Sequence, residues 1–519
     1  MSELSAVLLA QTPELSTARR EFFAGRYLLC LEECRALSAG RGPEREAALT
    51  LQAHALLRLW RPTEVVELLV AELREFEDVG HRLEAESQLA IAFATLNDYL
   101  NANALIANFK TPESEGLPAP LRDELLYVEA LVAWMEGKLG ESEAALERSS
   151  NSTPMVHGRN VMLKSWISAK RERYDEQAKL MLEGAEIVRT AEVLDVGLIA
   201  NAARVVCNAA REIYVPTLLD RAEELYKSIE WTTDLPVEHF NAARTLGWAM
   251  ALQGTERYFE SLRLLHQASR LAPTPAWKVW ALLDRAAMKR YAGELGASGA
   301  DLYEALDLVE SVNWGETTDV ERTGLLYAAE LLATVDSSGA AALLQRFNQI
   351  RESFSSRLSV RGDRLIEAAI AYSTGVVQQA LNDGRKARHF LESAYFVYDE
   401  IGFKWRAART ALHLHQITQD PSWHEAARRQ IRDFPNSWIA ADIREAATGI
   451  GDDGWNRLTP RQREVFNSLC EGLTAKRIGE RLKCSPNTVR NHIHWVYQAF
   501  RVQSQPELIA EARKRKLIS

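Results

Sequence analysis

The chain has 519 residues, of which 47% are hydrophobic and 26% are charged, and its formal net charge is −9 at pH 7. This balance is ordinary for a soluble globular protein. The length exceeds what one hydrophobic core usually spans, so we expect several domains or a repeat array. No run of about 18 apolar residues occurs, and the sequence therefore predicts no membrane-spanning helix and no membrane partner.

The N-terminal stretch and the cysteines favour a cytoplasmic location. The stretch MSELSAVLLAQTPELS carries Glu3 and no basic leader, so it does not have the pattern of a signal peptide. The five cysteines are an odd number and are spread widely along the chain, which is typical of a reducing compartment. We therefore expect a cytoplasmic protein.

The first 448 residues have almost no strand signal and are predicted to form one helix after another. Breaks rich in Gly, Pro, Asn and Asp recur, for example at 254–258, 293–296 and 382–384. The steps between them are about 35 to 45 residues, and a period of this size with two helices per repeat is typical of an α-solenoid. We therefore predict an all-α fold.

Residues 241–273 show the plan of one repeat. Gly247 and Met250 share a face of the first helix, the turn falls at 254–258, and Leu265 lies on the apolar face of the second helix. A small residue such as Gly247 lets a neighbouring helix approach closely. Because one repeat cannot bury its apolar face alone, neighbouring repeats must stack, and the stack curves into a groove.

These repeats resemble degenerate tetratricopeptide (TPR) repeats, similar to those of MalT-type regulators. The run 241–273 and the runs from Leu126 and Leu365 carry the resemblance. A groove of this kind is expected to bind a protein, a peptide or a small-molecule ligand. Six tryptophans lie within the predicted helices, where they either fill gaps between helices or line a ligand pocket: Trp134, Trp166, Trp248, Trp277, Trp280 and Trp405.

No catalytic site, metal site or cofactor is predicted. The chain has no GxxxxGK[ST] phosphate loop, and no parallel βα pattern with an acidic pocket indicates a receiver domain. Cys30 and Cys34 stand four residues apart on one helix face, which suits either two core residues or half of a metal site or redox pair. We expect a protein that is not an enzyme.

The helical pattern stops at 449–454, where three glycines and two aspartates predict a flexible linker. The predicted organisation is therefore a TPR-like repeat domain over 1–448, this linker, and a small module over 455–519. The module carries 13 Lys and Arg residues against 5 Asp and Glu residues, a formal charge of +8, which leaves −17 on the rest of the chain. A basic module on an acidic body is typical of a nucleic-acid-binding protein.

The module is predicted to contain four short helices, of which the second and third form a helix-turn-helix. Thr474, Ser485 and Ser504 are the expected N-caps of the last three helices. Steps of three and four residues place four apolar side chains of the third helix on one stripe: Val489, Ile493, Val496 and Phe500.

The opposite face of the third helix is polar and is predicted to read base edges in the major groove. Its members are Asn487, Arg490, Asn491 and His494. Arg pairs with guanine and Asn with adenine, each through two hydrogen bonds. Around this helix a basic face is expected to contact phosphates, and it comprises Arg463, Lys476, Arg477, Arg481, Lys483 and Arg490.

The runs LTPRQREV, EGLTAKRIGERL, SPNTVRNHI and RVQSQPELI resemble the C-terminal DNA-binding domain of the LuxR/NarL family of bacterial transcription regulators. The resemblance implies base contacts at Arg490, Asn491 and His494. It implies phosphate contacts at Lys476, Ser485, Thr488 and His492. It also implies that the last helix, residues 505–515, helps the domain to dimerise on DNA. One departure is Arg501, where the family usually has glycine.

Two hypotheses of different classes follow. In the first, the chain is a bacterial transcription regulator that binds double-stranded promoter DNA as a homodimer. Its solenoid then senses a partner or ligand, and RNA polymerase is a further expected contact. In the second, the solenoid is a scaffold and the C-terminal module docks onto a protein. The opposite charges also suggest that the acidic solenoid holds the basic module until a signal releases it.

Overall fold

The computed structural model describes residues 15–110, 116–213, 215–354, 364–448, 455, 458, 460–500, 502–515 and 517–518. Helices are the only regular elements in these ranges, as the predicted all-α fold requires. Within the same ranges, no helix combines the length and the apolar character that crossing a membrane demands.

The chain folds as two compact units. The first comprises Met1–Val206 and Glu224–His239, and the second comprises Cys207–Glu223 and Phe240–Ser519. Helices α13 (Val196–Ile213), α14 (Pro216–Lys227) and α15 (Pro236–Gln253) each contribute residues to both units.

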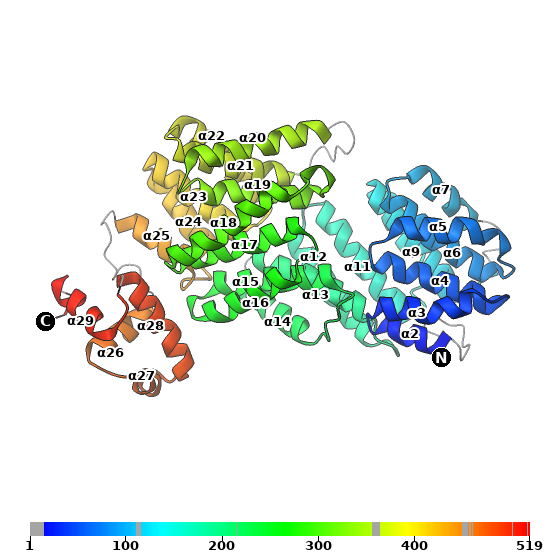
Figure 1. Cartoon of the computed structure of the whole chain (residues 1–519), viewed down its shortest axis with the longest axis horizontal. Helices are drawn as coiled ribbons and strands as arrows, with labels where there is room; N and C mark the ends of the chain where they lie inside the picture. Colours follow the sequence, from blue (N-terminus) through cyan, green and yellow to red (C-terminus); the bar gives the residue numbers. More distant parts are fainter. Residues whose placement is uncertain are drawn as a thin grey trace. The chain divides into compact units, whose positions relative to one another are not determined.

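The first unit is a row of helical hairpins (Figure 1). Its helices are α2 (Ser16–Phe23), α3 (Tyr27–Ser38), α4 (Pro43–Arg58), α5 (Pro62–Glu72), η2 (Leu73–Glu75), α6 (Val79–Thr95), α7 (Tyr99–Asn108), α9 (Ala119–Glu136), α10 (Leu139–Arg148), α11 (Pro154–Lys170) and α12 (Tyr174–Arg189). α4, α6 and α9 each pack against the next helix of the series α4, α6, α9 and α11, and each helix of the series also packs against the helix that follows it in the chain. This is the arrangement of a solenoid.

Two glycines set the distance between α11 and α12. A Cβ atom on Gly184 would lie 2.7 Å from Met162 Cγ and 2.9 Å from the carbonyl oxygen of Gly158, and a Cβ on Gly158 would lie 2.8 Å from the carbonyl oxygen of Gly184. The two backbones therefore touch where only hydrogen fits between them. In the same unit, Cys30 and Cys34 are both fully buried in α3, in agreement with the interpretation as core residues.

The second unit continues the same plan. Its helices after α15 are η3 (Thr255–Arg257), α16 (Tyr258–Leu271), α17 (Pro275–Tyr291), α18 (Leu295–Ser311), η4 (Trp314–Glu316), α19 (Asp319–Leu332), α20 (Ser337–Phe354), α21 (Arg364–Ala380), α22 (Gly384–Glu400), α23 (Lys404–Thr418), α24 (Pro421–Gln430), α25 (Trp438–Thr448), α26 (Pro460–Cys470), α27 (Ala475–Leu482), α28 (Pro486–Phe500) and α29 (Gln505–Lys514). The row α17, α19, α21, α23 and α25 forms the repeating series.

The turns and small residues of this series match the sequence pattern. The predicted breaks at 254–258, 293–296 and 382–384 each separate two consecutive helices. A Cβ on Gly247 would meet the backbone oxygen of Ser261 at 3.1 Å, so α15 and α16 approach as closely as predicted. The fold of this region is therefore a TPR-like solenoid.

Charged and aromatic side chains from the repeating helices meet at the centre of the second unit. Arg406 of α23 donates two hydrogen bonds to Glu212 of α13, and Arg409 Nη2 lies 2.6 Å from Glu330 Oε1 of α19. The Trp248 ring, 3% exposed, stacks on Trp405 with 6.0 Å between centroids. For this pair of tryptophans the gap-filling interpretation holds. Through these contacts α23 is joined to α13, α15 and α19.

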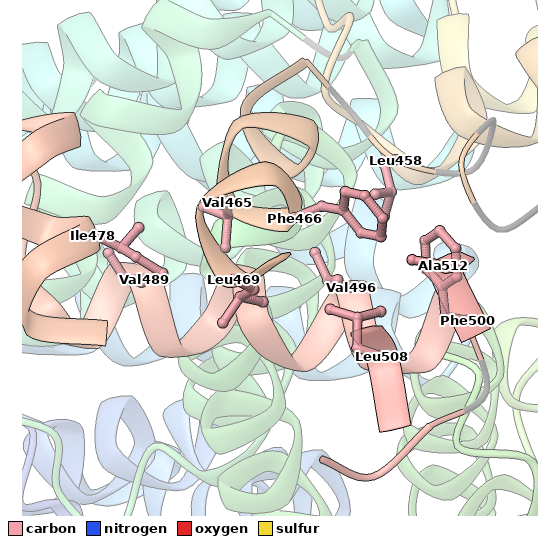
Figure 2. Close-up of a cluster of buried hydrophobic side chains, with 10 residues drawn as sticks. All are labelled: Leu458, Val465, Phe466, Leu469, Ile478, Val489, Val496, Phe500, Leu508 and Ala512. Carbon is pink, nitrogen blue, oxygen red and sulfur yellow. The ribbon is translucent and has the colours of Figure 1, made fainter. Parts of the chain in front are cut away.

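The last four helices, α26 to α29, have a small core of their own (Figure 2). The predicted four-helix pattern is confirmed, and side chains from all four helices interlock there: Leu458, Val465, Phe466, Leu469, Ile478, Val489, Val496, Phe500, Leu508 and Ala512. The Phe466 and Phe500 rings stack with 4.9 Å between centroids. This core fixes the apolar face of α28 against α26. The polar face of α28 is not part of the core. The predicted linker at 449–454 lies outside the described residues.

Candidate nucleic-acid interface

The turn between α27 and α28 is short because the backbone closes tightly on itself. Lys483 takes the left-handed conformation with φ 52°, and Cys484 N donates to the carbonyl oxygen of Gly479 at 3.0 Å. A Cβ on Gly479 would lie 2.8 Å from the carbonyl oxygen of Cys484, so this position suits glycine. Together, α27, the turn and α28 form a helix-turn-helix.

The Ser485 hydroxyl caps the start of α28, as predicted. Ser485 Oγ accepts a hydrogen bond from Thr488 N at 3.1 Å and lies 2.8 Å from Thr488 Oγ. Both residues therefore sit at the N-terminus of the helix, where the helix dipole favours anions. At the start of α27 the outcome differs, because Thr474 occupies the N-cap but its side chain makes no capping hydrogen bond.

The predicted base-reading residues all lie on α28, spaced by three and four residues, which places them on one face of the helix. The Arg490 side chain is exposed. The side chains of Asn487 and Asn491 lie outside the described part of the chain. Base contacts by these three residues stay predictions.

The predicted basic face divides into two groups. Lys476 and Arg477, in the first turn of α27, and Lys483 in the turn are exposed, and with Arg490 they surround the start of α28. By contrast, Arg481 forms an ion pair with Glu471.

Arg463 contacts Trp455: its Nε donates to the carbonyl oxygen of Trp455 at 3.3 Å, and its guanidinium lies over the Trp455 ring. Arg463 and Arg481 were both expected on the phosphate-contacting face, and each has a partner within the domain in this structure. Their phosphate contacts stay predictions.

His492 was expected to contact a phosphate, and here it is only 4% exposed. Burial, together with the nearby Arg461 guanidinium, lowers its pKa to about 4. The imidazole is therefore neutral near pH 7, so any contact that it makes with DNA lacks a formal charge. Its phosphate contact stays a prediction.

His494 lies against residues of the solenoid. Its Nε2 atom is 3.1 Å from Glu294 Oε1, at the turn between α17 and α18. Its ring stacks on Tyr258 with 5.8 Å between centroids and an interplanar angle of 9°, and the Phe259 ring lies 5.4 Å away. The proximity of this imidazole lowers the pKa of the Glu294 carboxyl below its ordinary value. His494, which was predicted to read bases, thus contacts Tyr258, Phe259 and Glu294 of the solenoid.

Trp495 extends this contact and was not singled out by the sequence analysis. It is 8% exposed, and its ring centroid lies 5.3 Å from that of Tyr258 and 5.1 Å from that of Trp438 in α25. One signal was present in the sequence. Trp495 is a large aromatic residue that falls off the stripe formed by Val489, Ile493, Val496 and Phe500, and its side chain is not part of the core of its own domain.

Comparison with protein families identifies the C-terminal domain. Residues 456–512 match the model of bacterial regulatory proteins of the luxR family. HTH-type transcriptional regulators of Mycobacterium tuberculosis and Mycobacterium bovis are 42% identical to this chain over 95 residues. The matched stretch is 16% of this chain, and it spans only 11% of the length of those relatives.

Solved structures also resemble the chain at low sequence identity. The apo form of the quorum sensor NprR from B. thuringiensis has a TM-score of 0.43 and 12% identity, covering 68% of this chain and 98% of that one. A Rap protein complexed with competence and sporulation factor has a TM-score of 0.39 and 11% identity, with coverages of 68% and 99%. The APC/C hetero-tetramer Cut9-Hcn1 has a TM-score of 0.37 and 13% identity, with coverages of 97% and 91%.

Proposed function

We propose that this chain, whose last four helices form a LuxR-type helix-turn-helix domain, is a transcription regulator that binds promoter DNA. The observation that carries the proposal is the position of exposed cations around the start of α28: Lys476, Arg477, Lys483 and Arg490. Cations at this place can hold phosphates on both sides of a major groove while α28 enters it.

In the proposed complex the two kinds of contact have separate tasks. Lys476, Arg477 and the capped N-terminus of α28 at Ser485 and Thr488 hold the backbone and set the register. Arg490, Asn491 and Asn487 read base edges from the first turns of α28, and His494 follows one turn later. Binding needs no catalytic step, and we propose that the chain is not an enzyme.

We further propose that the regulator is cytoplasmic and binds as a homodimer on an inverted repeat. α29 is the proposed dimer element. Its N-cap Ser504 accepts a hydrogen bond from Glu507 N, and Gln505 Nε2 donates to the carbonyl oxygen of Leu469, so α29 is tied to α26. A helix fixed in this way can set the distance between two recognition helices, with half-sites about 10 base pairs apart.

The solenoid is the proposed sensor. It would take a protein, a peptide or a small-molecule signal, and RNA polymerase is a further proposed partner of the bound regulator. The regularity of the stacked hairpins supports a role in binding, since solenoids present extended surfaces.

A genomic-fragment pull-down tests the proposal. Full-length protein is incubated with sheared genomic DNA at about 0.15 M salt, where non-specific phosphate binding is already weak. The bound DNA is then sequenced. The variant Arg490→Ala/Asn491→Ala is run in parallel, and Arg385→Ala, an exposed position of α22, serves as a control for loss of a positive charge.

We expect a shared sequence motif with the wild type and with Arg385→Ala, and its loss with the double variant. A motif that is still enriched by the double variant would show that α28 does not read bases in the major groove. The absence of a DNA motif for every variant, together with capture of a protein when the same chain is incubated with a cell extract, would favour the scaffold hypothesis instead.

A further inference from the structure

The recognition helix is held by a small set of side chains from the solenoid. Four solenoid residues surround His494 and Trp495 of α28: Tyr258, Phe259, Glu294 and Trp438. We call this group the clasp. Its members come from three separate places, namely the start of α16, the turn before α18 and the start of α25, and the η3 turn beside Tyr258 also packs on α28.

The clasp is well packed. Tyr258 is fully buried, Trp438 is 4% exposed and Trp495 is 8% exposed. The Tyr258 ring also lies 5.9 Å from Trp438, so each ring of the cluster has at least two neighbours. Aromatic groups buried at this density contribute most where water is fully excluded. The contact is therefore more specific than an attraction between an acidic body and a basic module.

The contact is also local. Beside the clasp lies a cavity of about 1110 Å³, which separates the C-terminal half of α23, at His415 and Gln416, from Ala499, Val502 and Gln503 of the DNA-binding domain. Residues on opposite sides of this space are not packed against each other. Changes to the clasp side chains should therefore weaken the attachment of α28.

The clasp and the major groove compete for the same face of α28. His494 lies one helical turn after Arg490, on the predicted reading face. The major groove is about 12 Å wide and admits one helix with its side chains, which is itself about 10–12 Å across. No room is left for α16 and α25 as a second layer, so α28 cannot enter the groove along its full reading face while the clasp is closed.

We propose that the clasp keeps the chain in a closed state, in which the solenoid blocks its own recognition helix, and that DNA binding requires the clasp to open. This inference rests on the proposed DNA-binding function. The occupant of the solenoid surface is thus the C-terminal domain of the same chain, and a signal activates the regulator by favouring the open state.

A release variant tests the proposal in the full-length chain. Glu294→Lys places a cation opposite His494 and beside Lys289, while Phe259→Ser removes a ring that is 46% exposed. Neither change empties a buried core position. The matched control, Tyr303→Ser/Glu304→Lys, makes the same kinds of change on the exposed face of α18. Affinity is measured for a mixed-sequence DNA duplex at about 0.15 M salt.

We expect the release variant to bind DNA at least about tenfold more tightly than the wild type, and the control to bind like the wild type. A second readout does not involve DNA. Amide hydrogen exchange, followed by mass spectrometry, compares the peptides that cover α28 and residues 255–262 in the wild type, the release variant and the control. Faster exchange of these peptides in the release variant alone is the expected result.

The outcomes separate the two proposals. If the wild type binds DNA measurably and the release variant binds no more tightly, the closed-state inference is overturned and the DNA-binding function stands. Equal exchange of these peptides in the wild type and the release variant would also overturn the closed state. If neither the wild type nor the release variant binds DNA, both the proposed DNA-binding function and this inference are overturned.

Discussion

Arg406 of α23 and Glu212 of α13 form a two-pronged ion pair although 194 residues separate them in the sequence. Arg406 Nε lies 2.7 Å from Glu212 Oε2, and Arg406 Nη2 lies 2.9 Å from Glu212 Oε1. Arg211 donates to the same carboxylate, and Glu212 is only 3% exposed. Because repeats in a solenoid mainly contact their neighbours, this pair joins helices that the repeat pattern alone would keep apart.

Loss of Arg406 should therefore destabilise the second unit. Arg406→Ala leaves a buried carboxylate with Arg211 as its remaining cation, and we expect the free energy of unfolding to fall by roughly 3 kcal/mol. Arg364→Ala is the control, since its pair with Glu400 is 42% and 66% exposed and should contribute less than about 1 kcal/mol. Urea unfolding followed by circular dichroism measures both. Equal losses would mean that the Arg406 pair is no stronger than a surface pair.

The same region should make the protein sensitive to acid. Burial, reinforced by Arg409, lowers the pKa of His413 to about 3, so between this value and the ordinary value of about 6.5 the unfolded chain binds a proton that the folded chain does not. The stability therefore falls as the pH drops through this window.

His413→Asn should reduce this sensitivity. An amide can still donate to Gln379 Oε1, which lies 2.8 Å from His413 Nδ1, but it does not titrate. Between pH 7 and pH 5 the variant should lose less stability than the wild type, measured as the shift of the urea midpoint. His239 and His492, whose pKa values burial lowers to about 4, leave part of the effect in place. An identical shift in both proteins would exclude His413 as a source.

The local sequence pattern predicted the helices and turns well, but it predicted the contacts between distant helices poorly. Helix starts such as Ser485, and the close approach at Gly247, follow from spacing and residue type over a few turns, and the structure agrees. The Glu212–Arg406 pair and the clasp around Trp495 join helices that lie far apart in the sequence. No local rule encodes such contacts, so Tyr258 and Trp438 carried no signal that they would face α28.

The Gly158–Gly184 contact predicts opposite effects for two similar substitutions. Gly184→Ala forces a methyl group to within 2.7 Å of Met162 and should cost about 1–3 kcal/mol through overpacking. Gly140→Ala, in α10, meets nothing within 4 Å and should be neutral or stabilising by up to about 1 kcal/mol. Thermal unfolding measures the difference. A loss of stability at both positions would show that helix packing does not set the requirement at Gly184.

The DNA interface predicts which residues contribute to the salt dependence of binding. Lys476 is exposed and charged, so Lys476→Ala should weaken binding to all sequences about equally and lower the slope of log K against log salt by about 1. Arg490→Ala should instead cost about 1–3 kcal/mol on the preferred sequence and relax the preference at one position.

His492→Gln tests whether His492 contributes a positive charge to DNA binding. With a pKa of about 4, His492 is neutral at pH 7.5, so its replacement should leave the salt slope unchanged even though it falls where the LuxR family contacts phosphate. Titrations at four salt concentrations between about 0.05 and 0.2 M, with Lys476→Ala alongside, give the slopes. A slope that falls by a full unit for His492→Gln would show that DNA draws the imidazole out of its buried site and protonates it. Burial in the free protein would then not decide its role.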